Sequence, residues 1–174
     1  GIIRAIVPDL EQLMRNYLYF LEKAKNGDIE AQEKYEWTMI ELFDQMVRNH
    51  SGGEMLNYWK QNPMPQEKFV IERTGSEVKN AIKKIRENPN IKPLKECIQK
   101  TEEEVGKFRL SGEVHQWMYD EYSLGNLLKN IGFKEIRKCN ADESNILEFN
   151  QYMLDIECDG SVRKPDSLFM EAQK

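Results

Sequence analysis

The chain has 174 residues, 40% hydrophobic and 32% charged, which is typical of a soluble globular protein with a core of its own. Its formal net charge of −5 argues against binding to the phosphate backbone of nucleic acids, because that binding requires a basic surface. No segment approaches the roughly 20 apolar residues needed to cross a bilayer, so no membrane association is expected.

The cysteine and histidine content limits the chemistry further. The three cysteines, Cys97, Cys139 and Cys158, are widely spaced and odd in number, so they form neither a disulfide framework nor a C-x-x-C metal motif. A reducing, cytoplasmic location is therefore expected. The two histidines, His50 and His115, have no metal-ligand spacing, and no metal is expected.

The first two thirds of the sequence predict one strand followed by helices. Residues 1–7 (GIIRAIV) are apolar and β-branched, which is typical of a strand buried on both faces of a parallel sheet. Apolar residues then recur every three or four positions as far as residue 25, and Asp28 is suited to cap a second helix that continues to about residue 50. The remaining helical segments expected before residue 110 are 54–60, a stretch after 65 that Gly75 interrupts, and 94–107.

The last third predicts one helix and two strands. The helix begins with Ser123 as its N-cap and ends at Gly132. Residues 133–139 and 167–172 predict the strands, separated by a connecting segment with a turn at Asp159-Gly160. The helix residues expected to face the core are Leu124, Leu127, Leu128 and Ile131.

Four segments, in order along the chain, resemble the C-terminal part of class I S-adenosylmethionine-dependent methyltransferases, of the bacterial kind found near surface-glycan genes. These segments are 1–11 (GIIRAIVPDLE), 44–55 (DQMVRNHSGGEM), 115–124 (HQWMYDEYSL) and a closing run from 122 that ends in 159–172 (DGSVRKPDSLFMEA). The resemblance implies that the three predicted strands are the fifth, sixth and seventh of that fold. The seventh strand would lie between the other two and run antiparallel to them, in the order 5-7-6.

The expected fold class is therefore α/β: a partial Rossmann-like methyltransferase fold, with a small mixed three-stranded sheet and a large helical block. We expect one domain over 1–174. Its parts are the first strand at 1–8, a helical insertion or substrate cap over 9–110, and a helix with two closing strands over 111–174.

The Gly-rich turn with which this family binds its cofactor is missing from the sequence. Such a turn follows a strand, whereas Gly52-Gly53, the nearest candidate, follows a predicted helix. The resemblance thus implies S-adenosylmethionine as the cofactor of the intact enzyme, with no cofactor expected for this chain alone. One edge of the first strand would then be bare, which favours a homodimer or pairing with another segment through that edge.

Candidate site residues lie at three places in the sequence: Asp9, the segment 115–119 and the turn at 51–53. Each also has a purely structural interpretation. Asp9 follows the first strand, where open α/β sheets place ligand contacts, and is equally suited to cap the next helix. His115 is the candidate catalytic base, because imidazoles ionise near neutral pH, unless it only packs or caps. Trp117 and Tyr119 could stack on a sugar ring, or simply pack.

The third place is the turn at 51–53. Arg48 and Glu54 could frame a polar or sugar substrate, or form an ordinary ion pair. His50, Gly52 and Gly53 belong to a loop that could close over the substrate, although helix C-termini favour histidine and arginine anyway.

Two functions of different classes follow. The first is the substrate-binding part of a methyltransferase, inactive alone, whose acceptor is a sugar or another small polar group. The second is a truncated, methyltransferase-derived module for dimerisation or interaction, without catalysis. A native start codon just before Gly1 would favour the second, and an upstream Gly-rich strand-turn-helix in the same reading frame would favour the first.

Overall fold

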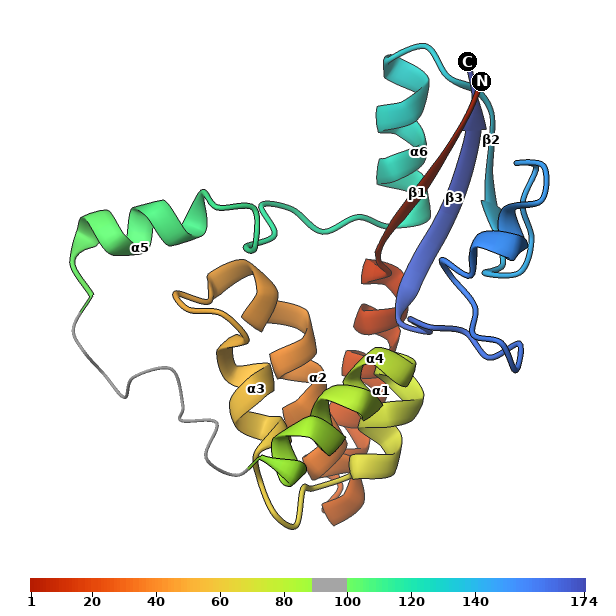
Figure 1. Cartoon of the computed structure of the whole chain (residues 1–174). Helices are drawn as coiled ribbons and strands as arrows, with labels where there is room; N and C mark the ends of the chain where they lie inside the picture. Colours follow the sequence, from red (N-terminus) through yellow and green to blue (C-terminus); the bar gives the residue numbers. More distant parts are fainter. Residues whose placement is uncertain (89–99) are drawn as a thin grey trace. The chain divides into compact units, whose positions relative to one another are not determined.

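The computed structural model describes residues 1–88 and 100–174, and Figure 1 shows their helices and strands. The described elements are β1 (Ile2–Pro8), α1 (Leu10–Lys25), α2 (Ile29–Val47), α3 (Gly53–Trp59), α4 (Glu67–Glu87), α5 (Glu102–Arg109), α6 (Glu121–Asn130), β2 (Lys134–Cys139), the 3-10 helix η1 (Phe149–Tyr152) and β3 (Ser167–Gln173). None of the described helices combines the length and the apolar composition needed to cross a membrane.

Two compact units contain these elements. The sheet unit consists of Gly1–Met14, Ile71–Val78 and Met118–Lys174. The helical unit consists of Arg15–Val70 and the described part of Lys79–Trp117. Each unit draws on segments that are distant in the sequence, and the single domain expected from the sequence stays a prediction.

The sheet has the strand order β1-β3-β2, and β3 pairs antiparallel with both of its neighbours. This confirms the predicted order, in which the last strand lies between the other two and runs against them. The sheet is not mixed as predicted, however, because β1 and β2 run in the same direction but do not pair with each other. The described chain is thus of the α/β class with a three-stranded antiparallel sheet.

One edge of β1 is open in the described chain. The carbonyl of Gly1 accepts from the Lys174 N–H, and the Asp9 N–H donates to the carbonyl of Asp166, so the odd-numbered residues of β1 bond to β3. The backbone N–H and C=O groups of successive strand residues point alternately towards the two edges of the strand. Those of the even-numbered residues of β1 therefore point to the open edge. The prediction that both faces of β1 are buried was wrong, because Ile2, Ile3 and Ile6 are 36–40% exposed.

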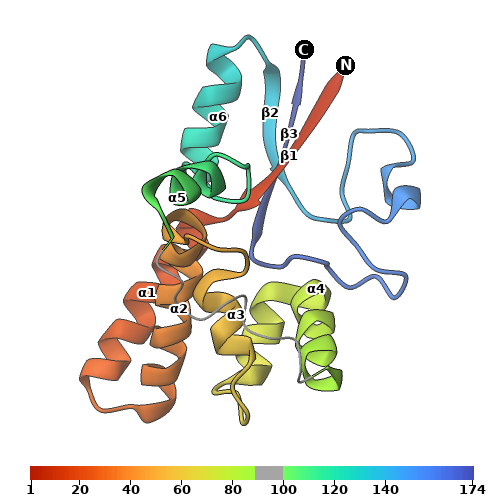
Figure 2. The same cartoon turned by 60° about the vertical axis from the view of Figure 1, so that its left-hand side comes forward.

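The two faces of the sheet are covered differently. Figures 1 and 2 show α6 along one face and the connection between β2 and β3 at the other. Leu124 and Leu128 of α6 pack against Leu168, Met170 and Ala172, every second residue of β3. The intervening residues Phe169 and Glu171 face the connection, where Phe169 packs with Cys139 and Ala141.

A buried ionic network anchors the connection to the sheet. The Arg4 side chain, 4% exposed, donates to Asp155 Oδ2 at 2.7 Å and to Glu171 Oε1 at 2.9 Å. It also donates to the carbonyls of residues 140, 141 and 143, and its guanidinium lies 4.7 Å from the centre of the Phe149 ring. Arg137 donates to the second Glu171 oxygen at 2.9 Å. The ion pairs and hydrogen bonds of Arg4 and Glu171 make the burial of these two charges tolerable.

The helical unit has an aromatic core. Trp37 of α2 is fully buried, lies against Tyr58 of α3, and donates its indole N–H to Glu41 at 3.0 Å. Asp28 caps α2 as predicted, by accepting from the Ala31 N–H at 3.0 Å. Phe20 of α1 meets Phe69 of α4 edge to face.

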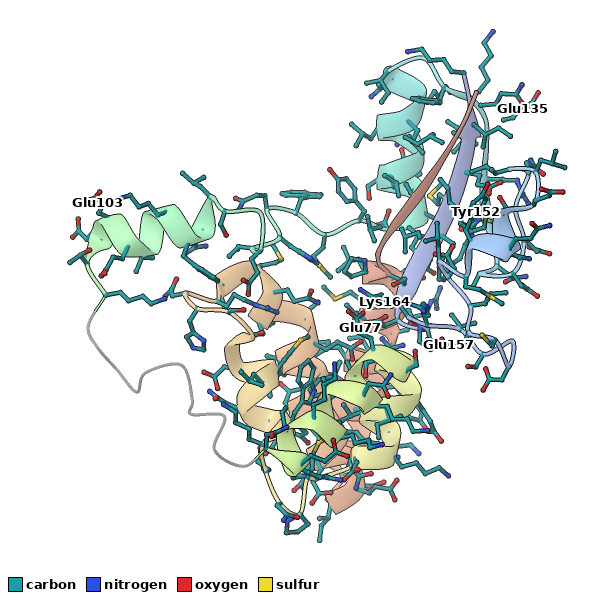
Figure 3. The ribbon with its side chains drawn as sticks, in the orientation of Figure 1. Glu77, Glu103, Glu135, Tyr152, Glu157 and Lys164 are labelled. Carbon is teal, nitrogen blue, oxygen red and sulfur yellow. The ribbon has the colours of Figure 1, made fainter. Side chains whose placement is uncertain are left out.

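Gly75 interrupts α4, as predicted, within the sheet unit. Its φ of +80° is left-handed, and a Cβ there would lie 2.0 Å from the carbonyl oxygen of Arg163. The kink brings Glu77 to 2.8 Å from Lys164, and Ser76 donates to Glu157 at 2.5 Å. Figure 3 shows these labelled side chains, Glu77, Glu157 and Lys164, gathered at one place.

Several predicted boundaries were wrong. The second helix ends at Val47 rather than at about 50, and α6 is capped by Asp120, so that Ser123 instead completes the capping box from inside the helix. Leu127 and Ile131 are 42% and 56% exposed, since the sheet covers only a narrow stripe of α6. The helix expected over 94–107 begins at Glu102, while its first part and Cys97 lie outside the described residues.

Candidate functional site

The carboxyl ends of β1 and β2 lie at one end of the sheet, since both strands run the same way. Asp9 follows β1 there and is 6% exposed. Its Oδ1 accepts from the Gln12 N–H at 3.1 Å, which caps α1, and its Oδ2 lies 3.4 Å from Nζ of Lys138 on β2. Asp9 therefore caps a helix and, with its other oxygen, presents a carboxylate at the strand ends.

Tyr119 lies beside Asp9. The two residues form an isolated parallel bridge, and the Tyr119 carbonyl accepts from the Leu10 N–H at 3.0 Å. The Tyr119 side chain packs against the apolar cluster beneath α6. The structure thus brings together two predicted site residues more than a hundred positions apart, with the Tyr119 side chain partly buried against the core.

The sequence patterns did not predict three further residues that lie around Asp9, namely Gln12, Arg73 and Lys138. Arg73 of α4 is 9% exposed and donates to the side-chain oxygen of Gln12. Lys138 could have been found, because it precedes the last residue of a correctly predicted strand. Arg73 could not, because nothing in its helix indicates that the Gly75 kink places it beside α1.

A groove of about 580 Å³ in the sheet unit runs along α6 and is also lined by Glu11, two residues after Asp9. Gly125 has no side chain and leaves room at the floor of this groove. A Cβ on Gly125 would lie 3.7 Å from Met170 Cε and 3.9 Å from Ile136 Cγ2. The polar residues that line it are Glu11, Asp120, Glu121, Tyr122, Asn126, Lys129 and Arg137. Acidic groups gather near the start of α6 and basic groups further along, so the groove suits a small polar molecule.

The Asp120 carboxylate in this groove is ionised at neutral pH. The backbone N–H of Ser123, and then the Ser123 hydroxyl, lower the pKa of Asp120 by donating to it, at 2.7 Å from the N–H and 2.9 Å from the hydroxyl. Because these donors belong to the capping box, the charge is fixed by the helix start rather than by a ligand.

The predicted turn residues of the helical unit surround Asp44, which is 4% exposed. Asp44 Oδ1 accepts from the Glu54 N–H at 2.6 Å, and Oδ2 lies 3.0 Å from the Arg48 guanidinium. A Cβ on Gly53, whose φ is +50°, would lie 2.2 Å from Asp44 Oδ1. These contacts fix the first turn of α3 and the entry to it, so the ion pair of Arg48 is made with Asp44 and not with Glu54.

The segment 113–115 passes beside the same turn. Glu113 accepts from the Gly52 N–H at 3.3 Å and lies 3.7 Å from Arg48, and the His115 N–H donates to the Gln45 carbonyl at 2.9 Å. His50 is half-buried, with Nδ1 3.2 Å from the carbonyl oxygen of Ser51. The structure therefore gathers the candidates at 48–54 and the His115 backbone in the helical unit.

The remaining candidates are divided between the units. Trp117 belongs to the helical unit and is 66% exposed, whereas Asp9 and Tyr119 belong to the sheet unit. Each set is consistent with contacts to a small polar molecule, and the sheet-unit set includes both a buried carboxylate and a groove.

Among the described residues, no Gly-rich loop directly follows a strand. A Gly-rich loop binds phosphate or ribose groups where missing side chains leave backbone N–H groups accessible after a strand. Here β1 ends at Pro8 and is followed by Asp9, and the space at Gly53 is filled by the Asp44 carboxylate. In the described part of the chain, no group of three or more His, Cys, Asp or Glu side chains is arranged to hold a metal ion.

Comparisons of the chain with protein-family models, curated proteins and solved structures gave no match.

Proposed function

We propose that this chain is the C-terminal, substrate-binding part of an S-adenosylmethionine-dependent methyltransferase, with a sugar or another small polar group as acceptor. The strand order β1-β3-β2 supports the proposal most strongly. In the family that the sequence resembles, the last three strands have this order. A helix precedes the sixth strand, and the seventh strand runs antiparallel to the fifth and the sixth. Here α6 precedes β2, and β3 closes the sheet in that way.

The Asp9–Lys138 pair would position the acceptor. Methyl transfer is an in-line displacement that requires the acceptor to be held close to the methyl carbon. A largely buried carboxylate at the strand ends accepts hydrogen bonds from hydroxyl groups, and the neighbouring ammonium, 3.4 Å away, orients that carboxylate. Within the helical unit, His115 remains the candidate general base, and Arg48, His50 and Trp117 remain candidate contacts to a substrate.

The cofactor would be bound by a Gly-rich half supplied from outside these 174 residues. The Pro8-Asp9 sequence at the end of β1 and the open edge of that strand support this part of the proposal. The chain alone is then inactive.

An interaction module without catalysis is the second candidate, and the open edge of β1 favours it. Three isoleucines of β1 are 36–40% exposed, and the even-numbered residues direct their backbone polar groups outward. Such an edge is a template for pairing with another chain.

Methyl transfer by a polypeptide extended upstream in the same reading frame tests the first proposal. Monosaccharides and nucleotide sugars serve as trial acceptors, and the release of S-adenosylhomocysteine is measured. Asp9→Asn should lower the transfer rate at least about tenfold without weakening cofactor binding, because it removes the oriented carboxylate. Asp28→Asn, which keeps a capping side chain on α2, is the matched control. An extended protein that neither binds S-adenosylmethionine nor releases product would contradict the proposal.

A further inference from the structure

Four apolar side chains are exposed within a single short segment of the connection between β2 and β3. Leu147, Tyr152, Met153 and Leu154 are 87, 67, 37 and 60% exposed. Single exposed apolar residues need no explanation, whereas four of them within eight consecutive residues make this segment a candidate interaction site. Tyr152 is labelled in Figure 3, at the end of η1. We refer to these four residues and the exposed acids among and before them, Asp142, Glu143 and Glu148, as the apolar–acidic patch.

Contacts with the sheet and within the connection fix the backbone that carries the patch. Phe149, in the middle of the segment, is 8% exposed, and its ring lies under the Arg4 guanidinium. The Asn150 side chain donates to the Asp142 carbonyl at 2.6 Å, and the Asn145 N–H donates to Glu171 at 2.8 Å. Because Phe149 already fills the space above the sheet, the four exposed side chains cannot reach the core without displacing it.

The segment that carries the patch is acidic, although two of its acids are paired, Asp155 with Arg4 and Glu157 with Arg163. Residues 140–160 contain six acidic residues and no lysine or arginine. Asp155 is buried against Arg4, whereas Asp142, Glu143 and Glu148 are exposed. An anionic lipid surface or a nucleic acid would be repelled from this rim, and a cationic partner attracted to it.

We propose that the apolar–acidic patch is a docking surface for a basic, amphipathic segment of a partner protein. Apolar side chains of that segment cover Leu147, Tyr152 and Leu154, and its lysine or arginine residues meet the acidic rim. Apolar anchors with a surrounding polar rim are the general arrangement of protein interfaces. The proposal is independent of methyl transfer, since the patch lies on the connection and involves neither Asp9 nor the groove along α6.

Fluorescence anisotropy of a synthetic amphipathic helix of leucine and lysine, titrated with the full chain, tests the proposal. The variant Leu147→Ser/Tyr152→Ser/Leu154→Ser should bind at least about tenfold more weakly. The matched control is Leu18→Ser/Ile29→Ser/Leu110→Ser, which removes apolar side chains 63, 72 and 84% exposed in the helical unit and should not change binding. Circular dichroism establishes that both variants are folded.

Charge is tested separately in the same assay. The variant Asp142→Asn/Glu148→Gln should bind the peptide more weakly. The control Glu102→Gln/Glu103→Gln on α5 should bind it unchanged. Salt at 1 M should weaken the wild-type complex, since it shortens the screening length to about 3 Å. Equal binding by all variants, or equal binding of a leucine–glutamate peptide, would overturn the proposal. It would also be overturned if vesicles of phosphatidylcholine and phosphatidylserine bound through the patch, or if sedimentation showed that the patch joins two copies of this chain.

Discussion

At the residue scale, Glu171 is the side chain on which the sheet and its connection both depend. It is 1% exposed, and its carboxylate accepts from Arg4, Arg137, the Ser144 hydroxyl and the Asn145 N–H. Burial by itself raises the pKa of Glu171, but these four donors outweigh burial and lower the pKa to about 2.

Replacing Glu171 by Gln should therefore destabilise the fold strongly. The substitution leaves the Arg4 and Arg137 charges without a shared counter-charge, and breaking a buried network in this way costs about 3–5 kcal/mol. Urea unfolding followed by circular dichroism measures the loss. Glu103→Gln, which breaks an exposed ion pair with Lys107, is the control and should leave the midpoint unchanged. Equal midpoints for the two variants would contradict the importance of the network.

The same carboxylate predicts how stability depends on pH. Its pKa is about 2 in the folded chain and near 4.3 in an unfolded one, so its contribution is complete above the unfolded value. The contribution is lost as the pH falls from about 5 towards 2. The wild-type free energy of unfolding should thus fall more steeply over this range than that of Glu171→Gln. Parallel slopes would show that Glu171 is not held ionised by the fold.

At the element scale, two glycines show where backbone conformation and packing coincide. Gly75→Ala should destabilise the chain by about 2 kcal/mol or more, because a Cβ would meet the Arg163 carbonyl at 2.0 Å in a left-handed conformation. Gly106→Ala on α5 is the control, since nothing lies within 4 Å of its added Cβ. That change should be neutral or stabilising by up to about 1 kcal/mol. Thermal unfolding of both variants compares them, and an unchanged midpoint for Gly75→Ala would mean that the kink is not required.

The open edge of β1 yields a prediction about association. If this edge pairs with another copy, sedimentation velocity should show concentration-dependent self-association of the chain. Ile6→Lys should reduce it, because a charge on an exposed edge strand opposes pairing. Leu110→Lys, at a position 84% exposed in the helical unit, should have no effect. Self-association that is equal in all three proteins would place the contact elsewhere.

Local patterns predicted most of the elements but fewer of their surroundings. The three strands, the Asp28 cap and the interruption at Gly75 follow from composition and turn residues, which are local. The cap of α6 was misplaced by three residues, because Asp120 and Ser123 both belong to one capping box and either could start the helix. At the candidate site Asp9 was found from its place after a strand, whereas Arg73 depends on a kink that sequence patterns do not orient.

At the scale of the whole molecule, the candidate residues belong to two compact units. Asp9, Tyr119 and the groove along α6 lie in the sheet unit, and the Asp44 cluster lies in the helical unit. In the proposed enzyme the cofactor would be bound by a half outside these residues. The apolar–acidic patch on the connection offers a separate means of association.

Calorimetric titration with S-adenosylmethionine tests this account most directly, using the 174-residue chain and the polypeptide extended upstream side by side, with S-adenosylhomocysteine in parallel. The account predicts no heat for the 174-residue chain up to millimolar ligand and micromolar binding by the extended protein. Micromolar binding by the 174-residue chain, or no binding by either protein, would contradict it.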